Sequence, residues 1–442
     1  MLDDRNLLIE YFDTNRLWPS PRNSRVHSKK QIRQIAKSIS TFGFTSPILI
    51  DEHLTILAGH GRWEAAKECG LKQIPCVVLS KMTPSQKRAY LIADNKLAEN
   101  AGWDREILAL EIKDLIELDA SFDVGVVGFE IAEIDSLIEG LRPEEPADPR
   151  ADHLPPIHER PVTREGDLWI LGKHKLYCGS ALEKSSFATL MGEEKADMVF
   201  TDPPYNVPIA GNVSGLGKVE HREFAMGSGE MSPAQFTEFL AVAFGHLIEC
   251  SVDGSIHFLC MDWRHMQELQ SAASGKYSGL KNLCVWVKTN GGMGTFYRSR
   301  HELVFAYKNG TAPHLNSFEL GQHGRNRSNV WQYAGMNSFG SGRDDELALH
   351  PTVKPVDLIV DAIKDVSERG GLVLDCFGGS GSTLIAAHKT ARRARLIELD
   401  PVYVDRTIRR WEVFAKDDAV LLRTGQSFLE VASARTTQSA FV

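Results

Sequence analysis

Leu372-Val-Leu-Asp-Cys-Phe-Gly-Gly-Ser-Gly-Ser-Thr383 is the stretch that most strongly indicates the fold. Its first three residues predict a buried strand, and the glycines that follow lead into a helix predicted over residues 384–388. Glycines let a backbone pass close to a ligand at a helix N-terminus, where N–H groups favour an anion such as a carboxylate. The segment has neither the G-x-G-x-x-G spacing of dinucleotide sites nor the Gly-Lys-Ser/Thr ending of phosphate loops.

Apolar runs elsewhere in this half of the chain predict further buried strands. They are Met198–Phe200, Ser255–Leu259, Leu283–Val287, Leu303–Ala306 and Arg395–Ile397. Helical spacing lies between several of them, as in Pro233–Cys250 and Val356–Val366. This alternation predicts a doubly wound α/β sheet, in which ligands bind beyond the carboxyl ends of the strands.

Asp202-Pro203-Pro204-Tyr205 directly follows the first of these strands. The carboxylate of Asp202 and the backbone carbonyl of Pro203 can accept the two hydrogens of an amino group, and the prolines fix where both acceptors point. The aromatic face of Tyr205 suits stacking of a base. Asp-Pro-Pro also ends strands in proteins without such a site, so the motif gains its meaning from the second motif.

The strand Arg395–Ile397 ends at Glu398-Leu-Asp400, about twenty positions after the glycine-rich loop. An acidic residue at this distance is placed to accept hydrogen bonds from ribose hydroxyls. Glu398 is the residue chosen for this role.

From about Gly166 to Thr407 the chain resembles the amino-methyltransferases of DNA in the permuted order called the β class, in which the catalytic tetrapeptide precedes the cofactor loop. His350-Pro-Thr-Val-Lys354-Pro355 and Gly166-Asp-Leu-Trp-Ile-Leu-Gly172 match further segments of that class. The resemblance implies S-adenosylmethionine as cofactor, catalysis by residues 202–205, and double-stranded DNA as substrate. It implies cofactor contacts from Asp375, Phe377, Gly378, Gly379, Ser380, Gly381, Glu398, Thr352 and Lys354. Ser180 stands where the class has an aspartate that contacts the cofactor's adenine, so no such role is expected of it.

The first letter of the tetrapeptide predicts the target base, because Asp in this class usually accompanies the N6 of adenine and Ser the N4 of cytosine. Cytosine stays open as an alternative. The target base is expected to be flipped out of the duplex, with Tyr205 and Phe377 as walls of its site. Residues 308–350 lack clear periodicity and are the candidate target-recognition region, with DNA contacts expected from Arg325, Arg327, Asn329 and Arg343.

The N-terminal part resembles the N-terminal domain of ParB partition proteins over about residues 7–100. The match rests on Ser46–Ile50, Ile56–Ala66 and Leu91–Lys96. His60 and Gly61 replace the glutamate and first arginine of the nucleotide-binding Gly-Glu-Arg-Arg segment, so nucleotide hydrolysis is not expected. Contact of the loop Gly59–Arg62 with phosphate or the DNA backbone stays open, as does a purely structural role.

The remaining predictions concern the division of the chain into domains and the cellular setting of the protein. The predicted organisation is a ParB-like α+β domain over residues 1–140, a Pro-rich linker over 141–161, a methyltransferase domain over 162–425 and a fraying tail over 426–442. Seven scattered cysteines without a C-x-x-C pair favour reduced thiols, and no signal or membrane-spanning segment is predicted. A cytoplasmic enzyme of restriction–modification type is expected, with no metal and with a homodimer left open.

Three rivals stay open beside adenine methylation. They are N4-cytosine methylation, a non-catalytic DNA-binding regulator of ParB type, and methylation of RNA or protein. The net charge of −8 does not exclude DNA, because a basic groove can lie on an acidic body.

Overall fold

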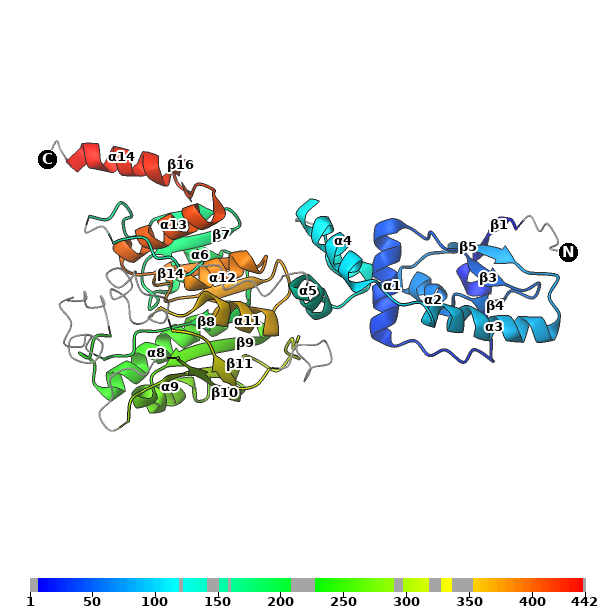
Figure 1. Ribbon diagram of the computed structural model, residues 1–442, viewed down its shortest axis with the longest axis horizontal. Coiled ribbons are helices and arrows are strands. Elements are labelled where there is room, and N and C mark those ends of the chain that lie inside the picture. Colours follow the sequence, from blue (N-terminus) through cyan, green and yellow to red (C-terminus); the bar gives the residue numbers. More distant parts are fainter. Residues whose placement is uncertain are drawn as a thin grey trace. The chain divides into compact units, whose positions relative to one another are not determined.

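The computed structural model describes residues 7–118, 122–140, 151–157, 160–207, 227–289, 297–317, 327–335 and 353–439. The chain divides into two compact units, Met1–Pro143 and Glu144–Val442 (Figure 1). In the sequence, this boundary falls within the Pro-rich stretch. Each unit has its own hydrophobic core.

The first unit is built on a five-stranded sheet with the order β1-β5-β3-β4-β2. Its strands are β1 (Ile9–Asp13), β2 (Trp18–Pro19), β3 (Ile48–Ile50), β4 (Thr55–Ala58) and β5 (Gln73–Val78). Its helices are α1 (Lys29–Phe42), α2 (His60–Glu68), α3 (Pro84–Glu99), α4 (Arg105–Leu118) and α5 (Ile131–Gly140). Ile48, Ile50, Ile56 and Ile74 form the centre of the sheet's core, while α4 and α5 enclose a small cluster of their own.

The second unit contains an eleven-stranded sheet with the order β12-β10-β11-β9-β8-β13-β14-β7-β6-β15-β16. The strands are β6 (Leu168–Leu171), β7 (His174–Cys178), β8 (Ala196–Thr201), β9 (Ser251–Met261), β10 (Gly279–Val287), β11 (His301–Lys308), β12 (Val330–Gln332), β13 (Leu372–Asp375), β14 (Arg393–Glu398), β15 (Val420–Leu421) and β16 (Gln426–Ser427). The central strands β9, β8, β13, β14 and β7 run parallel, as predicted for a doubly wound sheet. The added flanks β11–β10 and β6–β15–β16 pair antiparallel.

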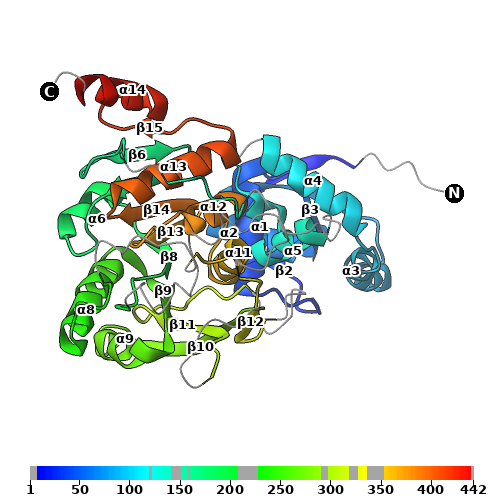
Figure 2. The ribbon, with the colours of Figure 1, turned by 60° about the vertical axis from the view of Figure 1, so that its left-hand side comes forward.

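Helices cover both faces of this sheet (Figure 2). They are α6 (Lys184–Met191), α8 (Pro233–Glu249), α9 (Met266–Ala273), α11 (Val356–Val366), α12 (Ser382–Lys389) and α13 (Pro401–Ala415). Alternate side chains of β8 show the two layers, because Met198 and Phe200 share a core with α11–α13 whereas Val199 shares one with α6, α8 and α9. The α/β fold class predicted from the sequence is therefore confirmed.

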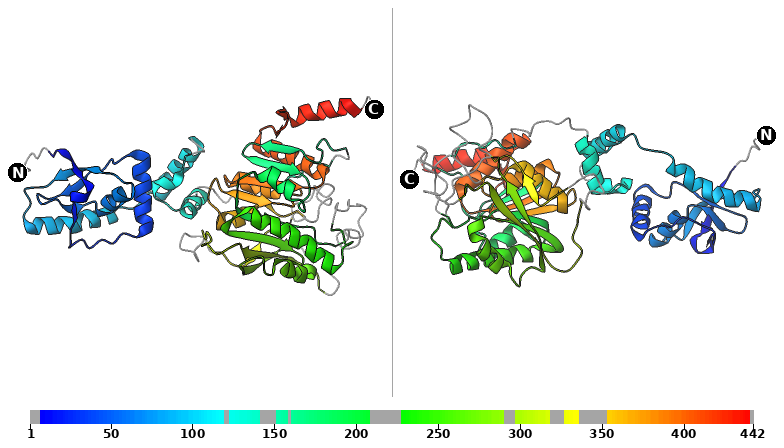
Figure 3. Two further views of the ribbon diagram at one scale, coloured as in Figure 1. Left: turned by 180° about the vertical axis from the view of Figure 1, so that it is seen from behind. Right: turned by 60° about the horizontal axis from the view of Figure 1, so that its bottom comes forward.

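Two regions differ from the expectations. Residues 428–439 form helix α14 (Phe428–Ser439) instead of a fraying tail (Figure 3). Phe428 and Val431 of this helix are buried in the core, which explains why the segment is ordered. Within the candidate recognition region, Val330–Gln332 forms strand β12 and pairs in parallel with β10.

None of the helices in the described ranges is long and apolar enough to cross a membrane.

Candidate functional site

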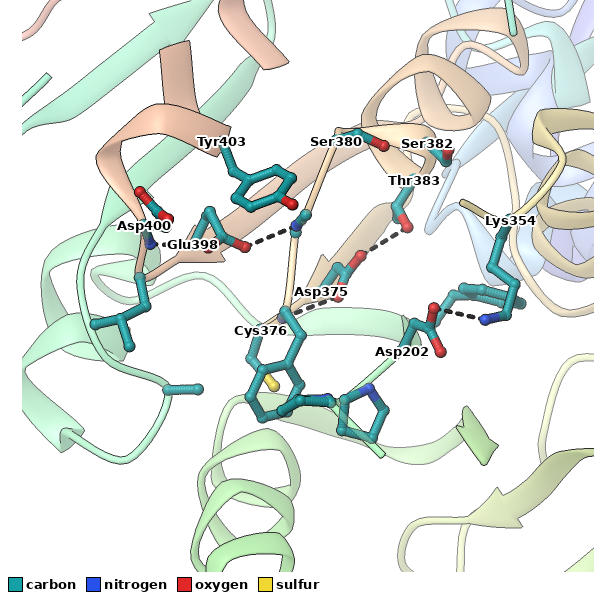
Figure 4. A pocket seen from close by; sticks show the side chains of 18 of the residues that line it. Asp202, Lys354, Asp375, Cys376, Ser380, Ser382, Thr383, Glu398, Asp400 and Tyr403 are labelled. Carbon is teal, nitrogen blue, oxygen red and sulfur yellow. Dashed lines mark hydrogen bonds and ion pairs between the residues drawn. The ribbon is translucent and has the colours of Figure 1, made fainter. Parts of the chain in front are cut away.

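A cavity of about 1400 Å³, its open mouth included, lies at the carboxyl ends of β8, β13 and β14. Strand β13 pairs with β8 on one side and β14 on the other, so the segments that follow all three strands reach the same edge of the sheet. Figure 4 shows side chains from these segments facing one another across the cavity. Most of the predicted site residues line it: Asp202, Pro203, Pro204, Tyr205, Lys354, Asp375, Phe377, Gly378, Gly379, Ser380 and Glu398.

Asp202 is held at the cavity by two partners. The hydroxyl of Tyr205 donates to its Oδ1 at 2.7 Å, and Nζ of Lys354 donates to its Oδ2 at 2.5 Å. Each carboxylate oxygen has further lone-pair capacity, so both can still accept a hydrogen from an incoming amino group. Lys354 thus lies in the pocket as predicted, but its ammonium group is directed at the tetrapeptide.

Asp375 organises the glycine-rich loop from inside. Its Oδ1 accepts from the hydroxyl of Thr201 at 2.8 Å and from the backbone N–H of Phe377 at 3.1 Å, and its Oδ2 accepts from the hydroxyl of Thr383 at 2.7 Å. Burial raises the pKa of Asp375 to about 6. Because Thr201 ends β8, its bond to Asp375 joins the cofactor loop to the strand that carries Asp202.

Gly381 shows why this loop needs glycine. It has a φ of +82°, and a Cβ built there lies 2.6 Å from Cγ2 of Thr407. Thr407 is on α13 and donates to the carbonyl of Gly379 at 3.0 Å, so it cannot move away without losing that bond. The backbone therefore packs directly against α13 and leaves the space in front of α12 open for a ligand.

Glu398 lies at the end of β14, where it was predicted to accept from ribose hydroxyls. Its two oxygens accept from the backbone N–H groups of Gly379 and Asp400, each at 2.8 Å. Burial raises the pKa of Glu398 to about 7, although these backbone hydrogen bonds act in the opposite direction. The carboxylate therefore fixes the loop while lining the cavity.

The residues of the cavity fit S-adenosylmethionine. The N-terminus of α12 suits a carboxylate, Glu398 and Asp400 suit hydroxyl and ammonium donors, and the rings of Phe377 and Phe239 offer an apolar wall. Tyr403, which the sequence analysis did not single out, also lines the cavity.

Of the four predicted DNA-contact residues, the structure describes Arg327 and Asn329. Arg327 bonds to Oδ2 of Asp365 at 3.0 Å, to Oδ2 of Asp361 at 3.2 Å and to the hydroxyl of Tyr333 at 3.1 Å. Its side chain is 16% exposed, so these contacts anchor the segment to α11 and leave little of the guanidinium for reading a base. Asn329 is exposed, and its amide donates to the carbonyl of Leu283. Arg325, Arg343 and Thr352 lie outside the described residues.

Besides Tyr403, the sequence analysis missed three polar residues beside the tetrapeptide and the glycine-rich loop: Thr201, Glu302 and Lys288. Glu302 lies on β11 and accepts from Lys354 at 2.8 Å and from Lys288 at 2.5 Å. Each lies in or next to an apolar strand, so only the pairing of distant strands places it at the site.

In the first unit, the loop Gly59–Arg62 opens helix α2. His60 is buried, and its Nε2 accepts from the backbone N–H of Ser20 at 3.2 Å. A Cβ built on Gly61 lies 3.0 Å from the ring of His27. The two residues that depart from the ParB pattern are thus packed inside the unit.

Models of known protein families match successive parts of the chain. A DNA methylase model covering N6 and N4 methyltransferases matches residues 196–409, a ParB N-terminal domain model matches residues 5–95, and a ParB-methyltransferase HTH domain model matches residues 106–165. The N-terminal part is 44% identical over 82 residues to the ParB-like nuclease domain-containing protein YnaK of Escherichia coli, covering 19% of this chain and 94% of that protein.

The C-terminal part is similar to type II methyltransferases. It is 24% identical over 250 residues to M2.MboI of Moraxella bovis, covering 53% of this chain and 86% of that enzyme. The solved structure of the cytosine-N4-specific PvuII DNA methyltransferase aligns with a TM-score of 0.42 and 15% identity, covering 58% of this chain and 90% of that one. The chain thus carries ParB-like domains ahead of a methylase domain. It belongs to the N6/N4 DNA methylase family and is an S-adenosylmethionine-dependent DNA methyltransferase.

Proposed function

We propose that the protein methylates the N6 amino group of adenine in double-stranded DNA. The observation that carries this proposal is the Asp202 carboxylate facing the same cavity as the glycine-rich loop, in a tetrapeptide that begins with Asp. Adenine is the base that usually accompanies Asp at this position in the family.

The tetrapeptide's role follows from the weakness of the target nucleophile. The lone pair of an exocyclic amino nitrogen is delocalised into the ring, and acceptors for its two hydrogens turn it toward the incoming methyl group. Asp202 and the carbonyl of Pro203 are the proposed acceptors, and Tyr205 is the proposed stacking surface. Bound S-adenosylmethionine supplies an electrophilic methyl group on a sulfonium centre.

The loop residues are proposed to hold this cofactor rather than to react. Ser380 and the N-terminus of α12 would bind its carboxylate, Glu398 its ribose, and Phe377 its apolar parts. Gly378, Gly379 and Gly381 allow the close approach, and Asp375 holds their loop in shape. Lys354 is proposed to act on Asp202 rather than on the cofactor.

Sequence recognition is proposed to come from the 308–350 region together with the helix-turn-helix domain. Asn329 remains a proposed DNA contact, as do Arg325 and Arg343. Binding of a nucleotide by the ParB-like domain is not proposed, because inward-packed His60 and Gly61 replace the charged residues of the family.

The test is incubation of duplex DNA with the protein and labelled S-adenosylmethionine, followed by identification of the modified nucleoside. We expect N6-methyladenine. N4-methylcytosine would refute the base assignment, and no transfer to any duplex would refute the enzyme proposal. Asp202→Ala should abolish transfer while leaving the cofactor dissociation constant within about threefold of the original value, because Asp202 lies at the base side of the cavity.

A further inference from the structure

We infer that Glu302 and Lys288 are positioning residues for methyl transfer, which together hold Lys354 so that Asp202 can take the proton released by the target amino group. The inference rests on the proposed function only in requiring that an amino group be methylated at Asp202. Neither Glu302 nor Lys288 lines the cofactor cavity described above.

The geometry is a compact cluster of two carboxylates, two ammonium groups and one phenol. Nζ of Lys354 lies 2.5 Å from Oδ2 of Asp202, 2.8 Å from Oε2 of Glu302 and 3.0 Å from the hydroxyl of Tyr205. The Tyr205 hydroxyl lies within 3.0 Å of oxygens of both carboxylates. Lys288 lies 2.5 Å from the other oxygen of Glu302 and contacts no oxygen of Asp202 among the described ion pairs.

The two carboxylates therefore have unequal surroundings. Glu302 faces two ammonium groups and its side chain is 11% exposed, whereas Asp202 shares one ammonium group with it and is 25% exposed. Burial raises the pKa of Glu302, but Lys354 and Lys288 outweigh it and lower that pKa to about 2. Burial raises the pKa of Asp202; Lys354 opposes this, and the negative charge of Glu302 adds to it.

This difference assigns separate roles to the two groups. Glu302 stays ionised and neutralises part of the charge of Lys354, which would otherwise make Asp202 a poor proton acceptor. Asp202, whose carboxylate pairs with Lys354 and whose pKa is raised overall by burial, is the better proton acceptor of the two carboxylates.

The step balances with these groups alone. The amino nitrogen forms a bond to the methyl carbon, and the bond between that carbon and sulfur breaks with its electron pair remaining on sulfur. The nitrogen becomes cationic, and one of its N–H protons passes to a carboxylate oxygen of Asp202, which later releases it to solvent. Asp202 needs no second acceptor for this step.

The two positioning residues carry opposite charges, so their neutral variants should have opposite effects. Glu302→Gln leaves Lys354 uncompensated and lowers the pKa of Asp202. Lys288→Gln leaves Glu302 with one ammonium group and raises the pKa of Asp202. A purely structural role would weaken the enzyme in both variants without shifting its pH dependence in opposite directions.

The experiment is single-turnover methylation of duplex DNA from pH 5 to 9 at saturating cofactor. We expect the acidic limb of the rate profile to move down by about one pH unit in Glu302→Gln and up by about one unit in Lys288→Gln. Lys281→Gln is the matched control, because Lys281 is an exposed lysine on β10, the strand that ends directly before Lys288. Its limb should stay in place, and all three variants should keep the cofactor affinity of the unmodified protein.

Unshifted limbs, or limbs that shift in the same direction, overturn the inference while the unmodified protein remains active. If Glu302→Gln does not fold, the partly exposed Lys288 still provides the test, because an absent or downward shift in Lys288→Gln overturns the inference by itself. Methylcytosine as product would refute the adenine proposal and leave this inference standing. An unmodified protein that transfers no methyl group would overturn both.

Discussion

The contact between Gly381 and Thr407 leads to a prediction whose magnitude follows from the structure. Gly381→Ala places a methyl group 2.6 Å from Cγ2 and 3.0 Å from Oγ1 of Thr407, at a φ of +82°. The left-handed backbone costs about 1–2 kcal/mol for a residue with a Cβ. Overpacking against a buried neighbour adds about 1–3 kcal/mol. We therefore expect a loss of about 2–5 kcal/mol in the free energy of unfolding of the second unit.

Thr407→Ala separates the two parts of this cost. Alone it removes the hydrogen bond to the carbonyl of Gly379 and should cost about 1 kcal/mol. In the double variant with Gly381→Ala it also removes the two atoms nearest the new methyl group. The backbone cost should remain while most of the clash disappears, so the double variant should be more stable than the sum of the single effects by about 1–3 kcal/mol.

The assays are urea unfolding of the full chain and calorimetric titration with S-adenosylmethionine. Because the loop is proposed to hold the cofactor, Gly381→Ala should weaken binding at least about tenfold, which corresponds to about 1.4 kcal/mol. Gly245→Ala is the control, because Gly245 lies within α8 at ordinary φ with no atom within 4 Å of a built Cβ. Effects that add to within about 0.5 kcal/mol would refute the packing argument.

Three further predictions concern other contacts of the site. Thr201→Val should weaken S-adenosylmethionine binding by about tenfold without loss of the fold, because it removes the 2.8 Å hydrogen bond to Asp375 from a fully buried position. Calorimetric titration of the variant measures this, and an unchanged affinity would contradict the idea that Thr201 supports the cofactor loop through Asp375. Affinity for the cofactor should fall about tenfold from pH 8 to pH 6, because the pKa of Glu398 is raised to about 7 and its carboxylate stops accepting hydrogen bonds from the ribose as it protonates below that pH. Glu398→Gln should make the affinity independent of pH in this range, and a remaining pH dependence would point to another titrating group. Arg327→Met should destabilise the second unit by about 3 kcal/mol in urea unfolding, because it removes the 3.0 Å ion pair that Arg327 makes with the buried carboxylate of Asp365. A stable variant with weakened DNA binding would instead support the recognition role first predicted for Arg327.

The sequence was sufficient where a function depends on neighbours along the chain. Asp202 and Tyr205 are three residues apart, and residues 375–383 form one strand–loop–helix segment, so their chemistry is visible as a local pattern. The strand rhythm around them likewise predicted the α/β fold. The antiparallel flanks were not predicted, because short strands such as β15 and β16 owe their pairing to tertiary contacts rather than to a local pattern.

Arg327 illustrates the opposite case. Its residue type and its place in an aperiodic segment suit DNA contact, but the same guanidinium also suits two carboxylates on α11. Residue type alone could not decide between these partners, because Arg bonds to carboxylates and guanine edges with the same donor geometry. The outcome depended on where α11 lies.

Thr201 shows why the missed residues matter to the function. In the register of β8 and β13, Val199 lies opposite Leu374, which brings the end of one strand beside the residue that begins the cofactor loop of the other. The two residues joined by the Thr201–Asp375 bond are 174 positions apart. A methyltransferase must hold acceptor and donor within bonding distance of each other, and separate loops would give that distance only loosely. The bond between the strand ends fixes the two loops to one rigid sheet edge, so the distance between Asp202 and the cofactor loop is set by the sheet itself.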